Sequence, residues 1–485
     1  MGDQEPEFAI VSKLCGDLLA QEASRRFPPI ERSLSMMSSA AVMVAANRNV
    51  PAPARRLNTM IASASESEDD DLLRSLSSKE TTPLSLRDLH AFCASPDAAA
   101  REQQAQFLHR ELPIRFAQRV IELQNLPYGL SDTKPVKEAA GWYARIMHSM
   151  QECPVPKGEL GEARFTSFLA SLVLDHTCIP QALSKGVLEL SERVDVGIVQ
   201  RHRMDRVLDN FFISRISMRF LVENFIASKN NRPGFSGVIE TECSPLEVAS
   251  KAAADVDRLC RAHIGDCPEI QLLGRPEDTF TTVTCHLYYI LYELLKNSCR
   301  ATVEHSRSKN GPGAPLPPVR MIVTRGKEEV TIKVMDEGGG IRRSDLQHVW
   351  SYMYSTAPRP SPDQLGGVPL EEMSGVMSSG STSGIEEKYA FAGYGMGLPL
   401  SRLYARYFGG SLKLRPMEGY GTDAYLHMHR LKTNSEESLP TALGETLRVM
   451  SDDGRVLASA SRSWDLPASD DSKARALIRS LGKGL

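Results

Sequence analysis

The sequence lacks any uninterrupted apolar stretch of about 18 residues, which excludes an integral membrane protein. Its formal net charge is only −3, and it has no basic run interleaved with aromatic residues, so nucleic acid is not an expected partner. The 9 cysteines are scattered without a C-x-x-C pair, which suggests neither a zinc site nor a disulfide framework. The H-R-D and D-F-G motifs of eukaryotic serine/threonine kinases are absent as well.

The chain has the length and composition of a globular protein with two domains and flanking tails. It contains 485 residues, of which 41% are hydrophobic. Single hydrophobic cores rarely grow beyond roughly 250–300 residues, so two cores are expected.

The N-terminal region, residues 1–84, is predicted to be disordered and resembles a transit peptide in composition. Residues 32–65 contain four arginines, many Ala and Ser, and no acidic residue. Because a transit peptide normally begins at the initiator methionine, this interpretation fits best if translation starts at Met36 or Met37. A merely flexible Ala/Ser tail remains an open alternative.

Residues 85–237 are predicted to form an antiparallel four-helix bundle, a regulatory domain. Apolar residues recur there at spacings of three and four. The four expected helices cover residues 100–123, 135–151, 162–193 and 199–227. A stretch rich in Asn, Pro and Gly at residues 230–237 places the domain boundary.

Residues 238–431 alternate between helical and strand patterns, which predicts an α/β sandwich with a mostly antiparallel sheet. Helices are expected at residues 244–263, 286–304 and 400–408, and strands at 319–324, 329–336, 411–415 and 422–428. A hairpin turn is expected around Gly326. Two long loops, 310–318 and 358–384, and a weakly patterned tail, 432–485, complete the chain.

One predicted helix gathers polar side chains on a single face. Since an α-helix turns about 100° per residue, Glu293, Asn297 and Arg300 fall within roughly 60° of one another. Leucines on the opposite side can seat the helix on the sheet. Alone, this spacing is more often a solvated helix face.

Three further motifs follow in order along the chain. Asp336 ends a strand and precedes three glycines, which let the backbone turn sharply beside a ligand. A G-x-G-x-G loop, Gly393 to Leu398, leads into a helix whose first N–H groups favour phosphate. Thr422 begins the last strand. Each motif is weak alone, but the order helix, strand, loop, strand is far more specific.

In this order the motifs resemble those of the Bergerat-type ATP-binding superfamily, and most closely those of the mitochondrial protein kinases. Pyruvate dehydrogenase kinase is the nearest resemblance, in its plant form, and branched-chain 2-oxoacid dehydrogenase kinase is the next. The resemblance extends from about Ala105 to Leu431 and includes the segments 126–130, 208–216 and 352–358. It implies an α + α/β architecture in which a four-helix bundle precedes the ATP-binding sandwich.

The resemblance assigns roles to individual residues. Glu293 would orient and deprotonate the substrate serine, Asn297 would hold Mg²⁺, and Asp336 would bind the adenine amine. Gly338 and Gly340 would let the adenine enter, and Lys296 and Arg300 would offset phosphate charge. The full expected set of ATP-binding residues is Glu293, Leu294, Leu295, Lys296, Asn297, Ser298, Cys299, Arg300, Asp336, Gly338, Gly340, Ser355, Thr356, Gly393, Tyr394, Gly395, Met396, Gly397, Leu398 and Thr422.

The chain departs from animal members of the family next to the expected catalytic residue. They carry a histidine four residues before the glutamate, where this chain has Tyr289. His286 lies seven residues before Glu293, about 10 Å along the helix axis, and is interpreted as structural. His176 lies where the family binds small 2-oxoacids and is a candidate regulatory residue.

The resemblance implies a protein-serine kinase that inactivates the decarboxylase of the pyruvate dehydrogenase complex. It would be a homodimer in the mitochondrial matrix and would dock on the lipoyl domain of the acyltransferase core. The branched-chain complex is the alternative substrate. A histidine kinase with its phosphate on His109 and an inactive nucleotide-gated scaffold are the remaining alternatives.

Overall fold

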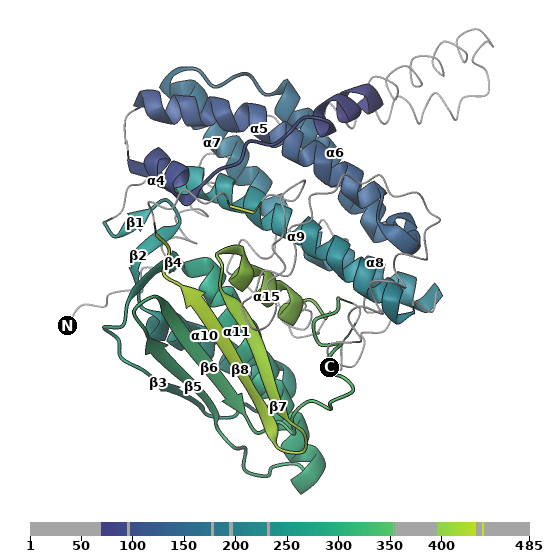
Figure 1. Cartoon of the computed structure of the whole chain (residues 1–485), viewed down its shortest axis with the longest axis vertical. Helices are drawn as coiled ribbons and strands as arrows, with labels where there is room; N and C mark the ends of the chain where they lie inside the picture. The colour runs from purple at the N-terminus through teal and green to yellow at the C-terminus, as the bar shows by residue number, and fades with distance from the viewer. Residues whose placement is uncertain are drawn as a thin grey trace, which may run out of the picture. The chain divides into compact units, whose positions relative to one another are not determined.

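The computed structural model describes residues 69–94, 98–175, 179–193, 197–229, 233–352, 354, 395–432 and 439–440. Its elements form a helical part and an α/β part that together make one compact unit through Leu439 (Figure 1). Among the described helices, none is both long and apolar enough to cross a bilayer.

The helical part begins earlier than predicted. Residues 69–77 form a helix, and the side chains of Leu73, Leu76 and Leu84 are buried in the helical core. The expectation that these residues belong to a disordered region is therefore wrong, because this segment supplies leucines to the core. Acidic residues at its first turn, such as Asp69, also favour the helix N-terminus. Residues 1–68, with the candidate transit peptide, lie outside the described residues.

The helices of this part are α4 (Leu86–Ala94), α5 (Ala98–Gln124), α6 (Lys134–Glu152), α7 (Gly158–Asp175), α8 (Ile179–Arg193) and α9 (Ile198–Ala227), with a short 3₁₀ helix at Pro127–Asp132. α5 packs against α6, α7 and α9, and α6 packs against α8. The single helix predicted over residues 162–193 is two helices, α7 and α8. Pro180 in the first turn of α8 explains the break, since proline is tolerated there but not inside a helix.

The α/β part contains two sheets. A small sheet has the order β1 (Phe235–Ser236), β2 (Ile239–Cys243) and β4 (Phe280–Val283). The main sheet has the order β3 (Ile270–Leu273), β5 (Val319–Arg325), β6 (Glu329–Asp336), β8 (Gly421–His429) and β7 (Ser411–Met417). All its neighbours are antiparallel except β3 and β5, and Gly326 closes the predicted hairpin by donating to Glu329 O at 2.8 Å.

Two long helices cover one face of the main sheet, α10 (Pro245–Ile264) and α11 (Thr284–Asn310). Val330, Ile332 and Val334 alternate toward this face and are fully buried beneath α11. Ser244 caps α10 by accepting from Glu247 N, and Gly265 ends the helix with a positive φ of 81°. This core therefore fixes α11 against the sheet.

Helix α15 (Gly397–Tyr407) joins the two parts. It packs against α11 and β7 on one side and against α9 on the other. Its Leu400, Leu403 and Tyr407 belong to the helical core, whereas Ala405 belongs to the core under the sheet. The predicted boundary near residue 237 is thus crossed by direct packing.

Candidate functional site

The candidate site forms where α11, the end of β6, the start of β8 and the start of α15 meet. Asp336 ends β6 and pairs with Thr422 of β8 in the sheet register. Ser298 of α11 reaches Asp336 across the sheet, and Gly397 at the start of α15 lies against Glu293 of α11. Residues from four separate elements therefore converge, as the order of the sequence motifs suggested.

Asp336 accepts hydrogen bonds from three segments of the chain. Its Oδ1 accepts from the backbone N–H groups of Gly338, at 3.0 Å, and Thr422, at 3.1 Å. Its Oδ2 accepts from Ser298 Oγ at 2.8 Å. Burial raises the pKa of this carboxyl above its ordinary value, against the lowering effect of these bonds. A carboxylate has about four acceptor positions, so one remains for an external donor such as an exocyclic amine.

The glycines after Asp336 make room for the chain itself. A Cβ on Gly338 would lie 2.6 Å from the Cβ of Ala301 in α11. Gly340 has a φ of 73°, and a Cβ there would collide with the carbonyl oxygen of Met417. These two positions let the turn pass between α11 and the β7–β8 turn, which places Asp336 at the mouth of the site.

Glu293 lies one helical turn and a half before Ser298 and is nearly buried. Its carboxylate pairs with Lys296 Nζ at 2.7 Å. A Cβ on Gly397 would collide with Glu293 Oε2, so the glycine is what lets α15 start this close to α11. The sequence motif assigned Gly397 to a phosphate loop and gave no sign of this contact, because the two residues are far apart along the chain.

The face of α11 that carries Glu293 also carries the partly buried Asn297 and Arg300. Arg300 Nε lies 3.5 Å from Glu304 Oε1. Leu294, Leu295 and Cys299 lie on the opposite side, with exposed fractions of 3%, 0% and 0%. The expectation that these three contact a nucleotide is corrected, since they face the core under the sheet and seat the helix.

The residues one and two turns before Glu293 on α11 are Tyr289 and His286, and both are uncharged. Burial and the charge of Glu293 raise the pKa of Tyr289 well above its ordinary value, so this side chain stays a neutral phenol. His286 packs 4.6 Å from the ring of Tyr404, and burial lowers its pKa to about 3. His286 is therefore a neutral packing residue, which supports its structural interpretation.

Ser351 and Tyr352, which precede the predicted nucleotide-site residues Ser355 and Thr356, are anchored on α9. Asp205 accepts from Ser351 Oγ at 3.0 Å and from Tyr352 N at 3.1 Å. Asp209 accepts from Tyr352 OH at 2.7 Å, and the ring of Tyr352 stacks on Phe212 at 5.3 Å. The sequence analysis gave these acidic residues no role. The acidic spacing of four within α9 was the available signal.

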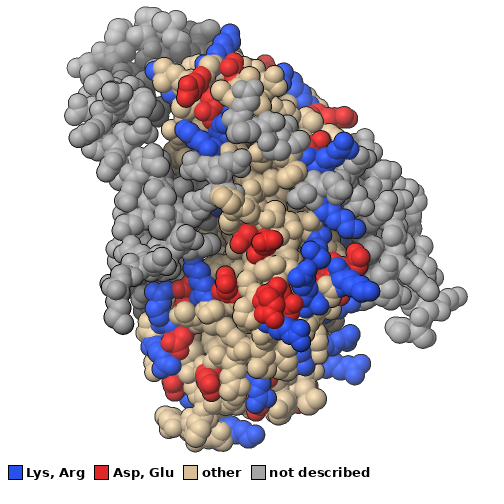
Figure 2. Space-filling model, turned by 90° about the vertical axis from the view of Figure 1, so that its left-hand side faces the viewer, with Lys and Arg blue, Asp and Glu red and all other residues tan. Residues whose placement is uncertain are grey.

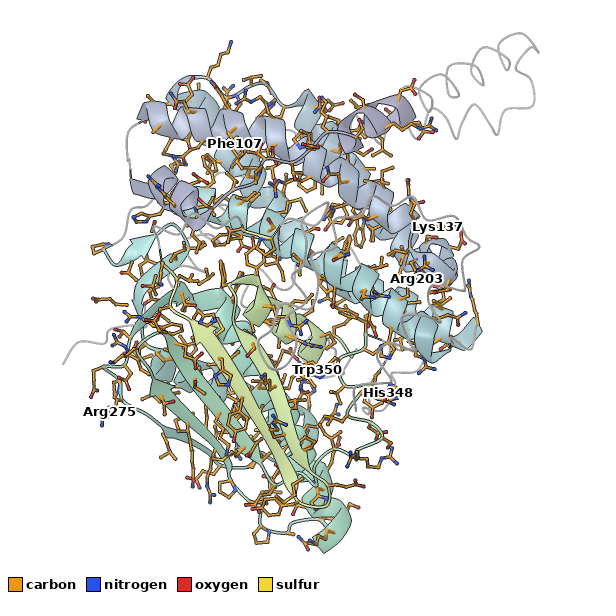
Figure 3. The ribbon with its side chains drawn as sticks, viewed as in Figure 1. Phe107, Lys137, Arg203, Arg275, His348 and Trp350 are labelled. Atoms are coloured by element: carbon orange, nitrogen blue, oxygen red, sulfur yellow. The ribbon has the colours of Figure 1, made fainter. Side chains whose placement is uncertain are left out.

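Trp350 and Gly395 hold the same segment from the side of α15. Arg402 of α15 lies over the ring of Trp350 at 4.9 Å, and Figure 3 labels Trp350 beside that helix. Gly395 has a φ of 73°, and a Cβ there would lie 2.6 Å from Tyr354 O. Tyr354 and Gly395, the described residues on either side of 355–394, therefore lie side by side.

Several predicted site residues are placed by the structure and others are not. Met396 is buried in the helical core, and Leu398 packs against the core under the sheet. Ser355, Thr356, Gly393, Tyr394 and His176 lie outside the described residues.

On the face shown in Figure 2, acidic and basic side chains are interspersed over the α/β part.

Comparison with known proteins agrees with this geometry in both halves of the chain. Residues 83–240 match the family of mitochondrial branched-chain alpha-ketoacid dehydrogenase kinase, and residues 283–432 match the family of histidine kinase-, DNA gyrase B- and HSP90-like ATPases.

The matches to known relatives cover most of the length of each relative. The mitochondrial pyruvate dehydrogenase (acetyl-transferring) kinase of Arabidopsis thaliana is 42% identical over 365 residues, which are 74% of this chain and 93% of the relative. The Drosophila melanogaster kinase of that name is 33% identical over 74% of this chain and 84% of the relative. Isozyme 1 of Homo sapiens is 33% identical over 70% of this chain and 76% of the relative. The chain therefore belongs to the family of mitochondrial pyruvate dehydrogenase kinases.

Proposed function

We propose that this chain is an ATP-dependent protein-serine kinase that phosphorylates and inactivates the decarboxylase component of the mitochondrial pyruvate dehydrogenase complex. The observation that carries the proposal is that α11 contacts both acidic residues, since its Ser298 donates to Asp336 and its own Glu293 pairs with Lys296. Asp336 offers a hydrogen-bond acceptor to the exocyclic amine of adenine, and Glu293 offers a carboxylate to the reacting hydroxyl. Membership of the kinase family supports the same reaction.

ATP would bind with its adenine at Asp336 and its phosphates toward the start of α15. Thr422 and Ser298 orient Asp336, so the amine of adenine would meet a fixed acceptor. The first backbone N–H groups of α15 have no partner within their own helix and favour the negative phosphates. Lys296 and Arg300 add positive charge along α11.

Glu293 would act on the substrate serine. The serine oxygen attacks the γ-phosphorus while the bond from that phosphorus to the β–γ bridging oxygen breaks, and ADP leaves. The hydroxyl proton passes to the Glu293 carboxylate, which is held by Lys296 at 2.7 Å. Because Tyr289 is a neutral phenol, Glu293 acts without a titrating histidine one turn earlier.

The residues also fit a magnesium ion. Asn297 lies one turn after Glu293 on the same face, is partly exposed, and offers a hard amide oxygen of the kind that Mg²⁺ accepts beside phosphate oxygens. Bound there, Mg²⁺ would neutralise charge on the transferring phosphate.

The names of the relatives support a mitochondrial setting. We infer a mitochondrial location, in the matrix, and docking on the lipoyl domain of the acyltransferase core as a homodimer. The branched-chain complex is the second candidate substrate, because the helical half of the chain matches the branched-chain kinase family.

Substitution of Glu293 tests the reaction. Glu293→Gln keeps the shape of the side chain but removes the base, so transfer of labelled phosphate from ATP to a purified decarboxylase complex should fall at least about 100-fold. ADP binding by calorimetry should stay nearly unchanged. Glu138→Gln, on the surface of α6, is the matched control. Undiminished transfer by Glu293→Gln would reject Glu293 as the base.

The substrate is tested by offering both complexes separately to the native chain. Preferential labelling of the pyruvate decarboxylase on serine is expected. Preferential labelling of the branched-chain decarboxylase would replace the proposed substrate. An acid-labile phosphate on His109 of the kinase itself would favour a histidine kinase, although His109 Nε2 lies 2.7 Å from Cys153 O in a packed position.

A further inference from the structure

Three cysteine sulfurs meet behind α11, on the side away from the candidate ATP site. Cys260 comes from α10, Cys267 from the loop between α10 and β3, and Cys299 from α11. Their Sγ atoms all lie within 4.8 Å of one another. The sequence spacing gave no sign of this group, because its members come from three separate elements.

The group is enclosed by the core under the sheet. The exposed fractions of Cys260, Cys267 and Cys299 are 0%, 6% and 0%. Buried cysteines are common as small apolar packing residues, so burial alone says little. Cys93 and Cys243 illustrate the ordinary case, in which one sulfur accepts from a neighbouring side chain, Asn224 or Thr284. In the three-cysteine group the thiols are instead one another's partners.

We propose that Cys260, Cys267 and Cys299 supply three ligands of a binding site for one Zn²⁺ ion. Zinc bonds to cysteine sulfur at about 2.3 Å, so tetrahedral ligands lie about 3.8 Å apart, and the observed group needs only a small contraction. Three sulfur donors exclude Mg²⁺ and Ca²⁺, which take oxygen ligands.

The ion would fasten α10 and the loop before β3 to the middle of α11. Cys299 directly follows Ser298, which donates to Asp336 in the candidate ATP site. The zinc site therefore holds the back of the helix whose front carries the ATP-site residues. It is independent of the proposed kinase substrate.

Metal analysis of the full chain tests the proposal. The chain is expressed with zinc in the medium, purified under reducing conditions without chelator, and analysed by inductively coupled plasma mass spectrometry. About one zinc per chain is expected, as in a structural site. Cys299→Ser and Cys267→Ser each remove one ligand, so each should reduce the zinc content by at least about tenfold. Cys243→Ser, a buried cysteine of the same part outside the group, should retain it.

A second measurement covers the case in which a variant folds poorly. Replacing zinc by Co²⁺ in the native chain should give the thiolate-to-metal absorption band near the ultraviolet, and a strong chelator should remove the band and lower the melting temperature. Cys243→Ser should behave like the native chain in both respects. Native chain that is folded but free of zinc, with no cobalt band, overturns the proposal. So does an intact mass two hydrogens lighter after reduction-free purification, which would mean a disulfide in place of the metal.

Discussion

Asp336 is the residue on which the proposed ATP site depends most directly. Ser298, Gly338 and Thr422 all donate to its carboxylate, so three elements must be in place before its remaining acceptor position faces the site. Asn in this position would offer an amide N–H₂ group toward backbone or hydroxyl donors. The single oxygen of Asn has two acceptor positions, and the N–H groups of Gly338 and Thr422 use both. No acceptor would then remain for an external amine, and leaving that donor unpaired costs about 1–3 kcal/mol.

We predict that Asp336→Asn weakens ADP binding at least about tenfold, which corresponds to roughly 1.4 kcal/mol. Isothermal titration calorimetry measures the affinity. Asp423→Asn is the matched control, since Asp423 directly follows Thr422 on β8 and its carboxylate pairs with Lys333 at 2.8 Å. Equal ADP affinity in Asp336→Asn and the native chain would remove Asp336 from the adenine site.

At the scale of the element, the position of the start of α15 depends on Gly397, which has no side chain. Gly397 lies so close to Glu293 Oε2 that a Cβ would collide with the carboxylate. Either α15 must move away from α11 or Glu293 must leave its position beside Lys296. Both movements disturb the geometry proposed for the reacting hydroxyl.

We therefore predict that Gly397→Ala lowers the rate of phosphate transfer at saturating ATP by at least about tenfold, since small displacements of a positioned group cost this much or more. Steady-state kinetics with a decarboxylase complex measures it. Gly141→Ala in α6 is the control, because a Cβ there lies 3.7 Å from its nearest neighbour, Arg145, and alanine favours the helix. An unchanged kcat in Gly397→Ala would show that the start of α15 is free to adjust.

Elements with strong local patterns were predictable from the sequence. The β5–β6 hairpin, the β7–β8 pair and helices α10 and α11 follow their apolar periodicity to within a few residues. The short strands β1, β2, β3 and β4 were not predicted, because strands of 2 to 5 residues are defined by distant partners rather than by their own pattern. The break between α7 and α8 was missed because apolar periodicity continues through it.

The candidate site likewise has residues that local motifs predict and contacts that only the packing of separate elements defines. Glu293, Asn297 and Asp336 were identified from motifs, since each motif is local. The contact of Gly397 with Glu293 and the grouping of Cys260 with Cys299 depend on how α11 packs against other elements. No spacing within one segment carries that information.

At the scale of the whole molecule, α9 connects the helical part to the nucleotide segment through carboxylates. Asp209 accepts from Tyr352 OH, and Arg402 and Arg406 of α15 lie close enough to act on its charge. Burial nevertheless raises the pKa of Asp209 from 3.8 to about 6. The ionised carboxylate at this junction is therefore held at a cost to folding stability.

The sign of the pH dependence follows from the raised pKa. A group whose pKa is higher in the folded state stabilises the fold fully below its unfolded pKa and loses that contribution as the pH rises through its folded pKa. For Asp209 the window runs from about pH 4 to about pH 6. Asn at this position keeps an acceptor for Tyr352 OH but does not ionise, so it avoids the loss.

We predict that the stability of Asp209→Asn relative to the native chain increases between about pH 4 and pH 6, by about 3 kcal/mol, and is constant above about pH 7. Urea unfolding at a series of pH values measures the difference. Asp88→Asn is the control of opposite sign, because hydrogen bonds from Ser85 lower the pKa of Asp88. This variant should lose stability relative to the native chain only as the pH rises toward about pH 4, and its difference should be constant between about pH 4 and pH 6. A difference between Asp209→Asn and the native chain that does not vary across this range would mean that the junction between α9 and Tyr352 tolerates the charge, and that the helical part does not sense pH through it.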